Sequence, residues 1–382
     1  MKEGWEYKKL GEVCSITMGQ SPASSSINES DGIEFHQGKT CFGKRFLGVS
    51  PSLCNAPVKL AEAHTVLLCV RAPVGFPNIT ERKICIGRGL CALSGNGTLD
   101  NNYLFYSLIG KQSYFEKNST GSTFKAISSK VVANTVLPLP PLSQQQSIVA
   151  ELDKINEIID LKKEQLKDLD LLAQSIFYDM FGDPIENSKG WEVKKLGEVS
   201  KVKIGPFGSL LHKSDYVTGG TPLVNPIHMK DGHIVKDDNF TITDEKKNEM
   251  SAYLLKEGDV LFARRGEIGR SAIVTKHEDG YLCGTGSLFV RFQEKLNNVF
   301  VLYWTNSKSF ITELVAQSKG ATMLNINCKI VEDLNIILPP LSLQQSFSSK
   351  IQAIESQKST IKQSLAEVET LLASRMDYWF GQ

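Results

Sequence analysis

Two stretches of the chain carry apolar residues at alternating steps of four and three positions. The first runs from Ile148 to Met180 and the second from Phe347 to Trp379, and neither contains Pro or Gly. This spacing is typical of a long helix whose apolar seam packs on another helix. The apolar seam positions are Ile148, Leu152, Ile155, Ile159, Leu166, Leu169 and Ile176 in the first stretch, and Ile351, Ile354, Ile361, Leu365, Val368 and Leu372 in the second.

The length of these helices indicates how they pack. A helix over 143–181 is about 58 Å long, more than a small domain can cover. We therefore expect the two helices to pair as an antiparallel coiled coil, with an amphipathic helix on a globular core as the alternative. Lys162 and Lys358 interrupt the seam, where they either set its register or extend their charged ends to its edge. A Pro-Pro-Leu-Ser sequence precedes each helix and predicts Ser143 and Ser342 as N-caps.

The rest of the chain alternates short apolar runs with glycine-rich polar segments, a pattern of mixed α and β structure. The predicted fold class is α+β, with two similar mixed α/β domains separated by the two long helices. The runs that predict strands are 65–71, 83–86, 259–263, 271–274 and 288–292, and short helices are expected at 101–112 and 298–315. The expected segments are a first domain at 1–142, a first helix at 143–183, a second domain at 184–341 and a second helix at 342–382.

This arrangement occurs twice along the chain. WEYKKLGEV at 5–13 returns as WEVKKLGEV at 191–199, with eight of nine residues identical. Further matches join 121–123 (GST) with 320–322 (GAT), and 139–146 (LPPLSQQQ) with 338–345 (LPPLSLQQ). The middle of each half shares little with the other. A period of roughly 190 residues indicates the duplication of a whole domain with its helix rather than a solenoid.

The distribution of charge along the chain is more informative about binding partners than the net charge. The chain has 382 residues and a formal net charge of +1, which excludes a uniformly basic surface for nucleic acid. Over 1–142, 15 basic residues against 10 acidic ones give +5, whereas 4 against 9 give −5 over 143–183. A polyanion would therefore meet the first domain or local basic patches rather than the first helix.

No constellation of residues for catalysis stands out. Gly38-Lys39-Thr40 lacks the upstream glycine of a phosphate-binding loop, and no Ser, Cys or His lies in a nucleophile motif. We predict no catalytic residue, no metal site and no cofactor bound by this chain, with a zinc site from some of the cysteines and histidines as the alternative. Eight irregularly spaced cysteines, no signal peptide and no membrane-length apolar run predict a cytoplasmic protein with reduced thiols.

Basic side chains are then the candidates for contact with DNA. Arg71 and Arg264 each follow an apolar strand and precede a turn glycine, which predicts a guanidinium at a strand exit, suited to guanine or phosphate. The alternative for each cation is an ordinary surface charge. The candidates are Lys39, Lys44, Arg45, Arg71, Arg88 and Lys125 in the first domain, and Lys213, Arg264, Arg265, Arg270, Lys319 and Lys329 in the second.

Taken together, the duplicated WEYKKLGEV, GST and LPPLSQQQ motifs and the long helix after them resemble the specificity subunit of type I DNA restriction–modification systems. The resemblance covers the whole chain. It implies two target-recognition domains, each reading one half of a split double-stranded DNA sequence, and two helices that fix the gap between the halves. It also implies a subunit without catalytic activity of its own.

The resemblance further implies partners that carry the chemistry. These are modification subunits, expected to be two, that methylate adenine with S-adenosylmethionine, and restriction subunits that translocate and cut DNA with ATP and Mg²⁺. No membrane partner is expected. Two alternatives stay open: a stand-alone nuclease with an unrecognised site, which would cut DNA by itself with Mg²⁺, and a two-headed protein scaffold, which would show no salt-dependent DNA binding.

Overall fold

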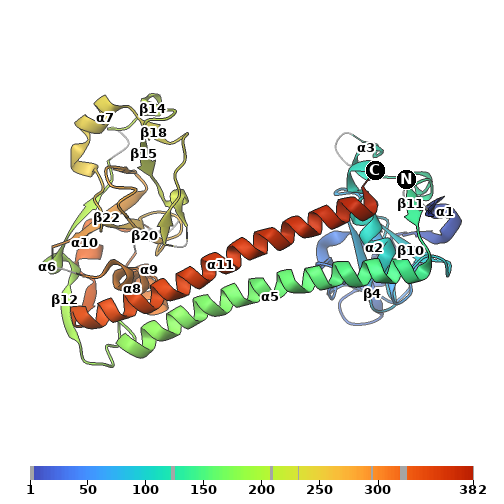
Figure 1. Ribbon diagram of the computed structural model, residues 1–382, viewed down its shortest axis with the longest axis horizontal. Helices are drawn as coiled ribbons and strands as arrows, with labels where there is room; N and C mark the ends of the chain where they lie inside the picture. The colour runs from blue at the N-terminus through green and yellow to red at the C-terminus, as the bar shows by residue number, and fades with distance from the viewer. Residues whose placement is uncertain are drawn as a thin grey trace. The chain divides into compact units, whose positions relative to one another are not determined.

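The computed structural model describes residues 4–121, 125–206, 210–230, 232–293, 296–318 and 325–381 (Figure 1). The chain divides into two compact units. Unit 1 comprises Met1–Glu164 and Lys362–Gln382, and unit 2 comprises Gln165–Ile361. The division falls inside both long helices, so that each unit combines one domain with one end of each helix, whereas the expected segments follow the order of the sequence.

The described residues of unit 1 form three β-sheets. The main sheet has four antiparallel strands in the order β2-β10-β7-β8, and a second has five strands in the order β3-β5-β4-β9-β6. The first and last strands of the domain, β1 and β11, pair antiparallel. The strands are β1 Glu6–Lys9, β2 Cys14–Met18, β3 Ile27–Asn28, β4 Ile33–His36, β5 Leu53–Cys54, β6 Leu60–Ala61, β7 Thr65–Cys69, β8 Pro77–Thr80, β9 Ile84–Ile86, β10 Leu90–Gly95 and β11 Val136–Leu139.

Unit 2 repeats the main sheet and the terminal pair of unit 1. The order β13-β22-β19-β20 corresponds to β2-β10-β7-β8, and β12 pairs with β23 as β1 does with β11. The other strands form different sheets, which agrees with the divergent middles of the two halves. The strands are β12 Glu192–Lys195, β13 Ser200–Ile204, β14 Tyr216–Val217, β15 Thr221–Val224, β16 Met229–Lys230, β17 His233–Ile234, β18 Thr241–Ile242, β19 Val260–Ala263, β20 Ser271–Ile273, β21 Leu282–Cys283, β22 Ser287–Phe292 and β23 Asn335–Leu338.

The short helix expected at 101–112 ends earlier, at Ile109, and the one expected at 298–315 is divided in two. The first breaks after Ile109 at Gly110, where an added Cβ would lie 3.0 Å from the Cβ of Phe380, so glycine permits this close approach. The second breaks at Ser307, whose hydroxyl caps the next helix by accepting from the amide of Phe310. The short helices are α1 Leu10–Val13, α2 Asn101–Ile109, α3 Gln112–Lys117, α4 Ser129–Ala133, α6 Leu196–Val199, α7 Asp244–Glu249, α8 Asn298–Thr305, α9 Lys308–Gln317 and α10 Cys328–Glu332.

The two long helices are α5 Leu142–Phe181 and α11 Leu341–Phe380, of 40 residues each. The N-caps predicted at Ser143 and Ser342 are wrong, because each serine lies inside the first turn of its helix. The first turn of α5 closes on the residue before the helix, with the amide of Gln144 donating to the carbonyl of Pro141 (2.9 Å). No helix among the described residues combines the length and the hydropathy needed to cross a membrane.

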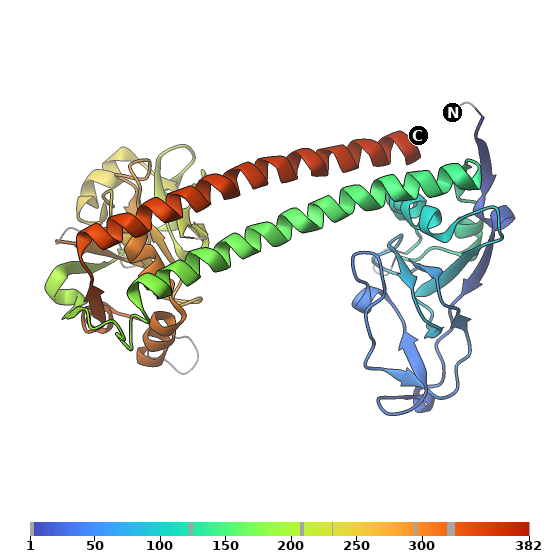
Figure 2. The ribbon, with the colours of Figure 1, turned by 60° about the horizontal axis from the view of Figure 1, so that its bottom comes forward.

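Within each unit the two long helices run side by side in opposite directions (Figure 2). All the seam positions are buried or half-buried, including Lys162 and Lys358. Ion pairs cross between the helices in both units, from Lys163 to Glu369 in unit 1 (2.9 Å) and from Lys358 to Asp170 in unit 2 (2.7 Å). The predicted fold class, two mixed α/β domains with an antiparallel pair of long helices, is confirmed.

Aromatic side chains near the helix ends join the cores of the domains. In unit 1 the ring of Phe380 packs on Tyr103 of α2, with ring centroids 5.4 Å apart. In unit 2, Phe181 packs on Phe300 of α8 at 4.8 Å and on Phe347 at 5.3 Å. Each domain and its helix ends therefore share one continuous core.

Candidate nucleic-acid interface

The main sheet of unit 1 directs an arginine to the surface where β7 ends. Beyond β7, the amide of Val70 donates to the carbonyl of Gly89 (2.9 Å), and its carbonyl accepts from the amide of Ile127 (2.9 Å). The next residue, Arg71, forms an isolated antiparallel bridge with Ala126. The backbone of Arg71 is therefore held from both sides, while its side chain is exposed.

The same hydrogen bonds recur in unit 2, where β19 ends. The amide of Arg264 donates to the carbonyl of Gly286 (3.0 Å), and its carbonyl accepts from the amide of Ile326 (3.1 Å). The next residue, Arg265, bridges Asn325, and its side chain is exposed. Arg265 therefore occupies the backbone position that Arg71 has in unit 1.

This equivalence corrects the pairing of Arg71 with Arg264 that was expected from the sequence. Arg264 corresponds to Val70 and is only 6% exposed. Its Nε donates to the side-chain oxygen of Asn325 (3.3 Å), and burial, with the neighbouring charge of Arg265, lowers its pKa. The exposed arginine at the strand exit of unit 2 is thus Arg265, one residue after the arginine expected from the sequence.

Unit 1 brings three of the predicted cations together around one small pocket. Lys39, Arg71 and Arg88, which we call the Arg71 cluster, are all exposed. They line a cavity of about 190 Å³ together with Gln37, Gly38, Ala72 and Gly89. The ammonium of Lys39 lies 4.3 Å from the ring centroid of Phe76. No ion pair joins the Arg71 cluster to an acid among the described residues, so its charges face solvent and suit an anionic ligand.

Lys44 and Arg45 lie elsewhere, against helix α5. The ammonium of Lys44 is 2.7 Å from a carboxylate oxygen of Asp160. The guanidinium of Arg45 pairs with Asp153 and donates to the side-chain oxygen of Asn102 (2.8 Å). The structure therefore gives these two predicted DNA-binding residues partners within their own unit.

The remaining candidates are dispersed. Arg270 pairs with Glu267 and donates to the carbonyl of Pro226 (3.1 Å). Lys329 is 3.5 Å from Asp333, one helical turn away, and Lys125 is exposed. The side chain of Lys213, all of Lys319, and most of the GST and all of the GAT motif lie outside the described residues. Of the described candidates, Lys125 has its backbone beside the Arg71 cluster, because its carbonyl accepts from the amide of Ala72 (3.0 Å), whereas Arg270 and Lys329 belong to unit 2.

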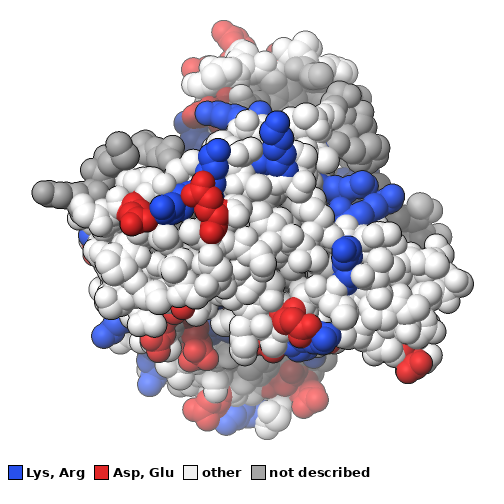
Figure 3. Space-filling view, turned by 90° about the vertical axis from the view of Figure 1, so that its right-hand side faces the viewer, with Lys and Arg blue, Asp and Glu red and all other residues white. Residues whose placement is uncertain are grey.

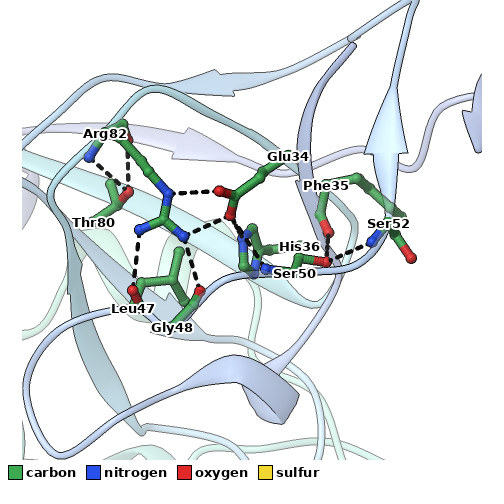
Figure 4. A network of polar contacts seen from close by, with 9 residues as sticks. All are labelled: Glu34, Phe35, His36, Leu47, Gly48, Ser50, Ser52, Thr80 and Arg82. Atoms are coloured by element: carbon green, nitrogen blue, oxygen red, sulfur yellow. Dashed lines mark hydrogen bonds and ion pairs between the residues drawn. The ribbon is translucent and has the colours of Figure 1, made fainter. Parts of the chain in front are cut away.

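One cation of the first domain has a structural role (Figure 4). Arg82 donates to both carboxylate oxygens of Glu34 (2.7 and 2.6 Å) and to the carbonyls of Leu47 and Gly48 (3.1 and 3.0 Å). These bonds from Arg82 lower the pKa of Glu34 to about 2. The ring of His36 is buried 3.0 Å from the same carboxylate, and its burial lowers its pKa. This network ties together the strands and loops beneath the surface.

Figure 3 shows a face of unit 1. Lysine and arginine side chains lie there in small groups among acidic and uncharged ones, rather than in one continuous field. Contact with DNA at this face would therefore depend on particular side chains more than on a uniform potential.

The described residues offer no group of three or more potential metal ligands. The eight cysteines are free, and burial raises the pKa of Cys14, Cys69 and Cys91 to about 12. These three thiols therefore stay protonated at neutral pH and are poor nucleophiles.

Reasoning from the sequence missed Gln37 and the glycines that shape the pocket. Gly89 lies so close to Gln37 that a Cβ would be 2.1 Å from its carbonyl oxygen. In unit 2 a Cβ on Gly284 would meet the side-chain oxygen of Asn225 at 2.2 Å. The signal was a Gly-x-Gly sequence directly before β10 and again before β22, at 87–89 and 284–286. It marks tight backbone contact beside the strand exits.

Comparison with known proteins adds evidence from sequence. The family model described as the type I restriction modification DNA specificity domain matches residues 2–171 and 188–370. The putative type I restriction enzyme MjaX specificity subunit of Methanocaldococcus jannaschii is 38% identical over 179 residues, which are 46% of this chain and 42% of that protein. The MjaIX specificity subunit of the same organism is 24% identical over 377 residues, 92% of this chain and 86% of that protein.

Solved structures agree on the fold. The type I restriction–modification S subunit from M. genitalium has a TM-score of 0.54 at 14% identity, covering 99% of this chain and 96% of that one. A second solved structure, described as the structural basis of complex assembly and conformational transition of the type I R-M system, has a TM-score of 0.69 at 20% identity. The match covers 100% of this chain and 98% of that one. The two matched copies of the domain account for most of the sequence. The chain therefore belongs to the type I restriction–modification DNA specificity family and is a DNA target-recognition subunit with two recognition domains.

Proposed function

We propose that this chain reads a bipartite DNA target, one half-site with each domain, and recruits modification and restriction subunits to it. The observation that carries this proposal is the shared position of Arg71 and Arg265. Each is exposed at a strand exit whose backbone is fixed by equivalent hydrogen bonds in the two domains. A planar guanidinium in such a place can pair with a guanine edge or a phosphate through two parallel hydrogen bonds.

The surroundings of the two arginines differ, as two different half-sites would require. Arg71 is joined by Lys39 and Arg88, whereas Thr285 takes the place of Arg88 between the two glycines of unit 2. The remaining sheets of the two domains also differ in strand order. A common frame with different side chains supports a common mode of docking and a different base sequence for each domain.

The long helices support a fixed gap between the half-sites. Helix α5 is continuous over 40 residues, and its two ends belong to the two different units. A helix of that length spans about 60 Å, and pairing with α11 would stiffen it. The gap length is then a property of the helices and not of the recognition domains.

The chemistry is assigned to the partners. Two modification subunits would methylate adenine with S-adenosylmethionine, and restriction subunits would use ATP and Mg²⁺, in the cytoplasm. This chain would bind none of these cofactors. The family assignment does not favour a stand-alone nuclease or a protein scaffold.

The test is an exchange of residues 14–136 for the matching region of a relative with another specificity. Methylated sites are mapped in cells that express the modification subunit with either version of the chain. We expect one half of the methylated sequence to change, with the other half and the gap preserved. A change in both halves, or DNA cutting by the purified chain with Mg²⁺ alone, would count against the proposal.

A further inference from the structure

A loop of the first domain is fastened to helix α5 through Arg45. Its guanidinium pairs with Asp153 of α5 and donates to Asn102 of α2 (2.8 Å). The hydroxyl of Tyr106 donates to the same carboxylate oxygen of Asp153 (2.5 Å) and accepts from the side-chain amide of Asn156 (3.3 Å). We call Arg45, Asn102, Tyr106 and Asp153 the Arg45 clamp.

The clamp leaves the guanidinium little capacity for another ligand. The side chain of Arg45 is 20% exposed, and its Nε is buried without a hydrogen-bond partner among the described residues. The rings of Phe46, Phe105 and Tyr106 surround the guanidinium, with centroids 5.3 to 5.8 Å from its carbon. A cation already paired and flanked by three rings is unsuited to a DNA phosphate, which needs free donors.

Unit 2 has no such clamp at the corresponding position among its described residues. The amide of Ile79 donates to the carbonyl of Arg45 (2.9 Å), and the amide of Ile273 donates to the carbonyl of Gly232 (3.1 Å). Because these isoleucines occupy equivalent places in β8 and β20, Gly232 stands where unit 1 has Arg45. An added Cβ there would lie 2.9 Å from the methyl carbons of Leu302, so this loop meets its helix by close apolar packing.

The acidic partner also differs between the halves. By the 199-residue offset that relates Pro140 to Pro339, the counterpart of Asp153 is Gln352, and it is exposed. Both members of the ion pair have therefore diverged together. The clamp is a feature of the first recognition domain and not of the fold.

From this geometry we infer that Arg45 is a positioning residue, which holds the first recognition domain at a fixed angle to α5 and thereby sets the gap length the subunit accepts. The inference rests on the proposed function, because only a subunit that reads a bipartite target selects a gap length. It assigns that selection to a contact within the protein, between Arg45 and Asp153, and not to a contact with DNA. Asp153 is the anchor on the helix. Loss of either partner would let the domain tilt, so that its half-site could be met at more than one distance from the other.

The test uses the full chain in complex with its modification subunits. Binding is measured to duplexes that carry both mapped half-sites, with the natural gap and with gaps one and two base pairs shorter or longer. In Arg45→Gln and in Asp153→Asn we expect the preference for the natural gap to fall roughly tenfold, with half-site sequences unchanged. Arg45→Lys, which keeps the charge, should recover part of the preference. Combining Arg45→Gln with Asp153→Asn should add little to either single change, because both remove one interaction.

Three results would each overturn the inference or its premise. If Arg45→Gln weakens binding equally at every gap and lowers the salt slope by about one, while Asp153→Asn does not, Arg45 holds a phosphate instead. Unchanged gap preference in both variants would remove the positioning role. If the unaltered chain shows no gap preference, the proposed function itself fails. If Arg45→Gln does not fold, the gap preference is measured with Asp153→Asn and Arg45→Lys instead.

Discussion

The indole ring of Trp5 stacks on that of Trp379, with ring centroids 5.8 Å apart and 4° between the ring planes. Trp5 lies just before β1, and Trp379 is in the last turn of α11. The indole nitrogen of Trp379 donates to Glu151 of α5 (3.1 Å), which also pairs with Arg375. The start of the first domain, the first turns of α5 and the end of α11 are thus held together in unit 1.

Replacing Trp379 by Ala should destabilise unit 1. The change removes the stacked ring and the hydrogen bond to Glu151, so we expect a loss of about 2 kcal/mol for this half-buried side chain. Chemical unfolding of the full chain, followed by fluorescence and circular dichroism, measures it. Leu371→Ala is the control, since Leu371 is 48% exposed on the same helix. Equal losses in the two variants would show that the stack contributes nothing specific.

A buried glutamine fixes the start of each long helix. Gln145 accepts from the amide of Asp100 (2.9 Å) and donates to the carbonyls of Thr98 and Pro140 (2.9 and 2.8 Å). Gln344 is bonded to the amide of Asn297 and the carbonyl of Pro339 in the same way. The repeated Gln of the LPPLS motif therefore joins the helix to the cap of α2 or α8.

Substitution of Gln145 by Leu should cost about 2 kcal/mol, because three backbone groups lose their partner, and the hydrogen bond to the carbonyl of Pro140 is buried. The adjacent Gln146 is exposed, so Gln146→Leu is a matched control with an expected change within about 0.5 kcal/mol. Urea unfolding of both variants gives the comparison. A Gln145→Leu variant as stable as the control would mean that these hydrogen bonds have no net value.

The long helices could be predicted because their partner is a helix with the same period. The apolar seam from Ile148 to Met180 repeats every seven residues. An apolar residue at a seam position is expected to pack on the apolar seam of the partner helix, so the sequence pattern alone predicts its surroundings. The strands of the main sheet were similarly evident, since Thr65–Cys69 and Val260–Ala263 are buried along their whole length.

The site could be predicted less well, because it depends on contacts between distant segments. The sequence paired Arg71 with Arg264 because each follows an apolar strand and precedes a turn glycine, but the strand exit is defined by hydrogen bonds to Gly286 and Ile326, which no local pattern shows. Lys44 and Arg45 read as free cations because Asp153 and Asp160 are more than 100 residues away in the sequence. The net charge of a segment does not reveal which of its cations are already paired.

Acidification should weaken the first domain through Glu34 and His36. The folded pKa of Glu34 lies near 2, below its value in the unfolded chain, so its contribution is complete above about pH 5 and is lost as the pH falls toward 2. Burial lowers the pKa of His36 in the folded state. Below about pH 6.5 the unfolded state therefore binds a proton at His36 more readily than the folded state does, which also lowers the stability as the pH falls. Together these shifts predict a loss of up to about 3 kcal/mol between pH 7 and pH 3, given that Glu34 is partly exposed.

Unfolding at a series of pH values tests this account. Glu34→Gln should be less stable at pH 7 and lose most of the slope between pH 5 and pH 3. His64→Asn is the control, since His64 is exposed and its positive φ of 63° is tolerated by Asn. An unchanged slope in Glu34→Gln would assign the acid sensitivity to other carboxylates.

The strand-exit arginines predict separable effects on the two half-sites. Arg71→Gln and Arg265→Gln should each weaken binding of the bipartite target by roughly 1–3 kcal/mol, and relax the sequence at one position if the arginine reads a guanine. Arg264→Gln is the informative comparison, because Arg264 is buried and its loss should lower the stability of unit 2 before it alters specificity. Binding to libraries randomised in one half-site at a time separates these cases. If Arg71→Gln changed the half-site that also depends on Arg265, the assignment of one half-site to each domain would fail.

The paired helices predict that the gap can be lengthened without touching either recognition domain. Seven residues inserted after Glu164 of α5, with seven more after Ile361 of α11, add about 10 Å to each helix, or about three base-pair rises. Because seven residues are one full repeat, the seam stays in phase, and the pairs Lys163–Glu369 and Lys358–Asp170 remain inside their own units.

We expect the preferred gap to lengthen by about three base pairs, with both half-site sequences unchanged. Duplexes with gaps from one base pair shorter to five base pairs longer should be compared. Three added base pairs also turn the duplex by roughly 100°, so the preferred gap length can differ by one base pair from the value set by length alone. Inserting the seven residues in α5 alone is the matched control. That change leaves α11 too short to reach its partners in both units, so binding should fall at every gap. Full-strength binding at the original gap only, by the doubly extended chain, would mean that the modification subunits and not the helices set the distance between the half-sites.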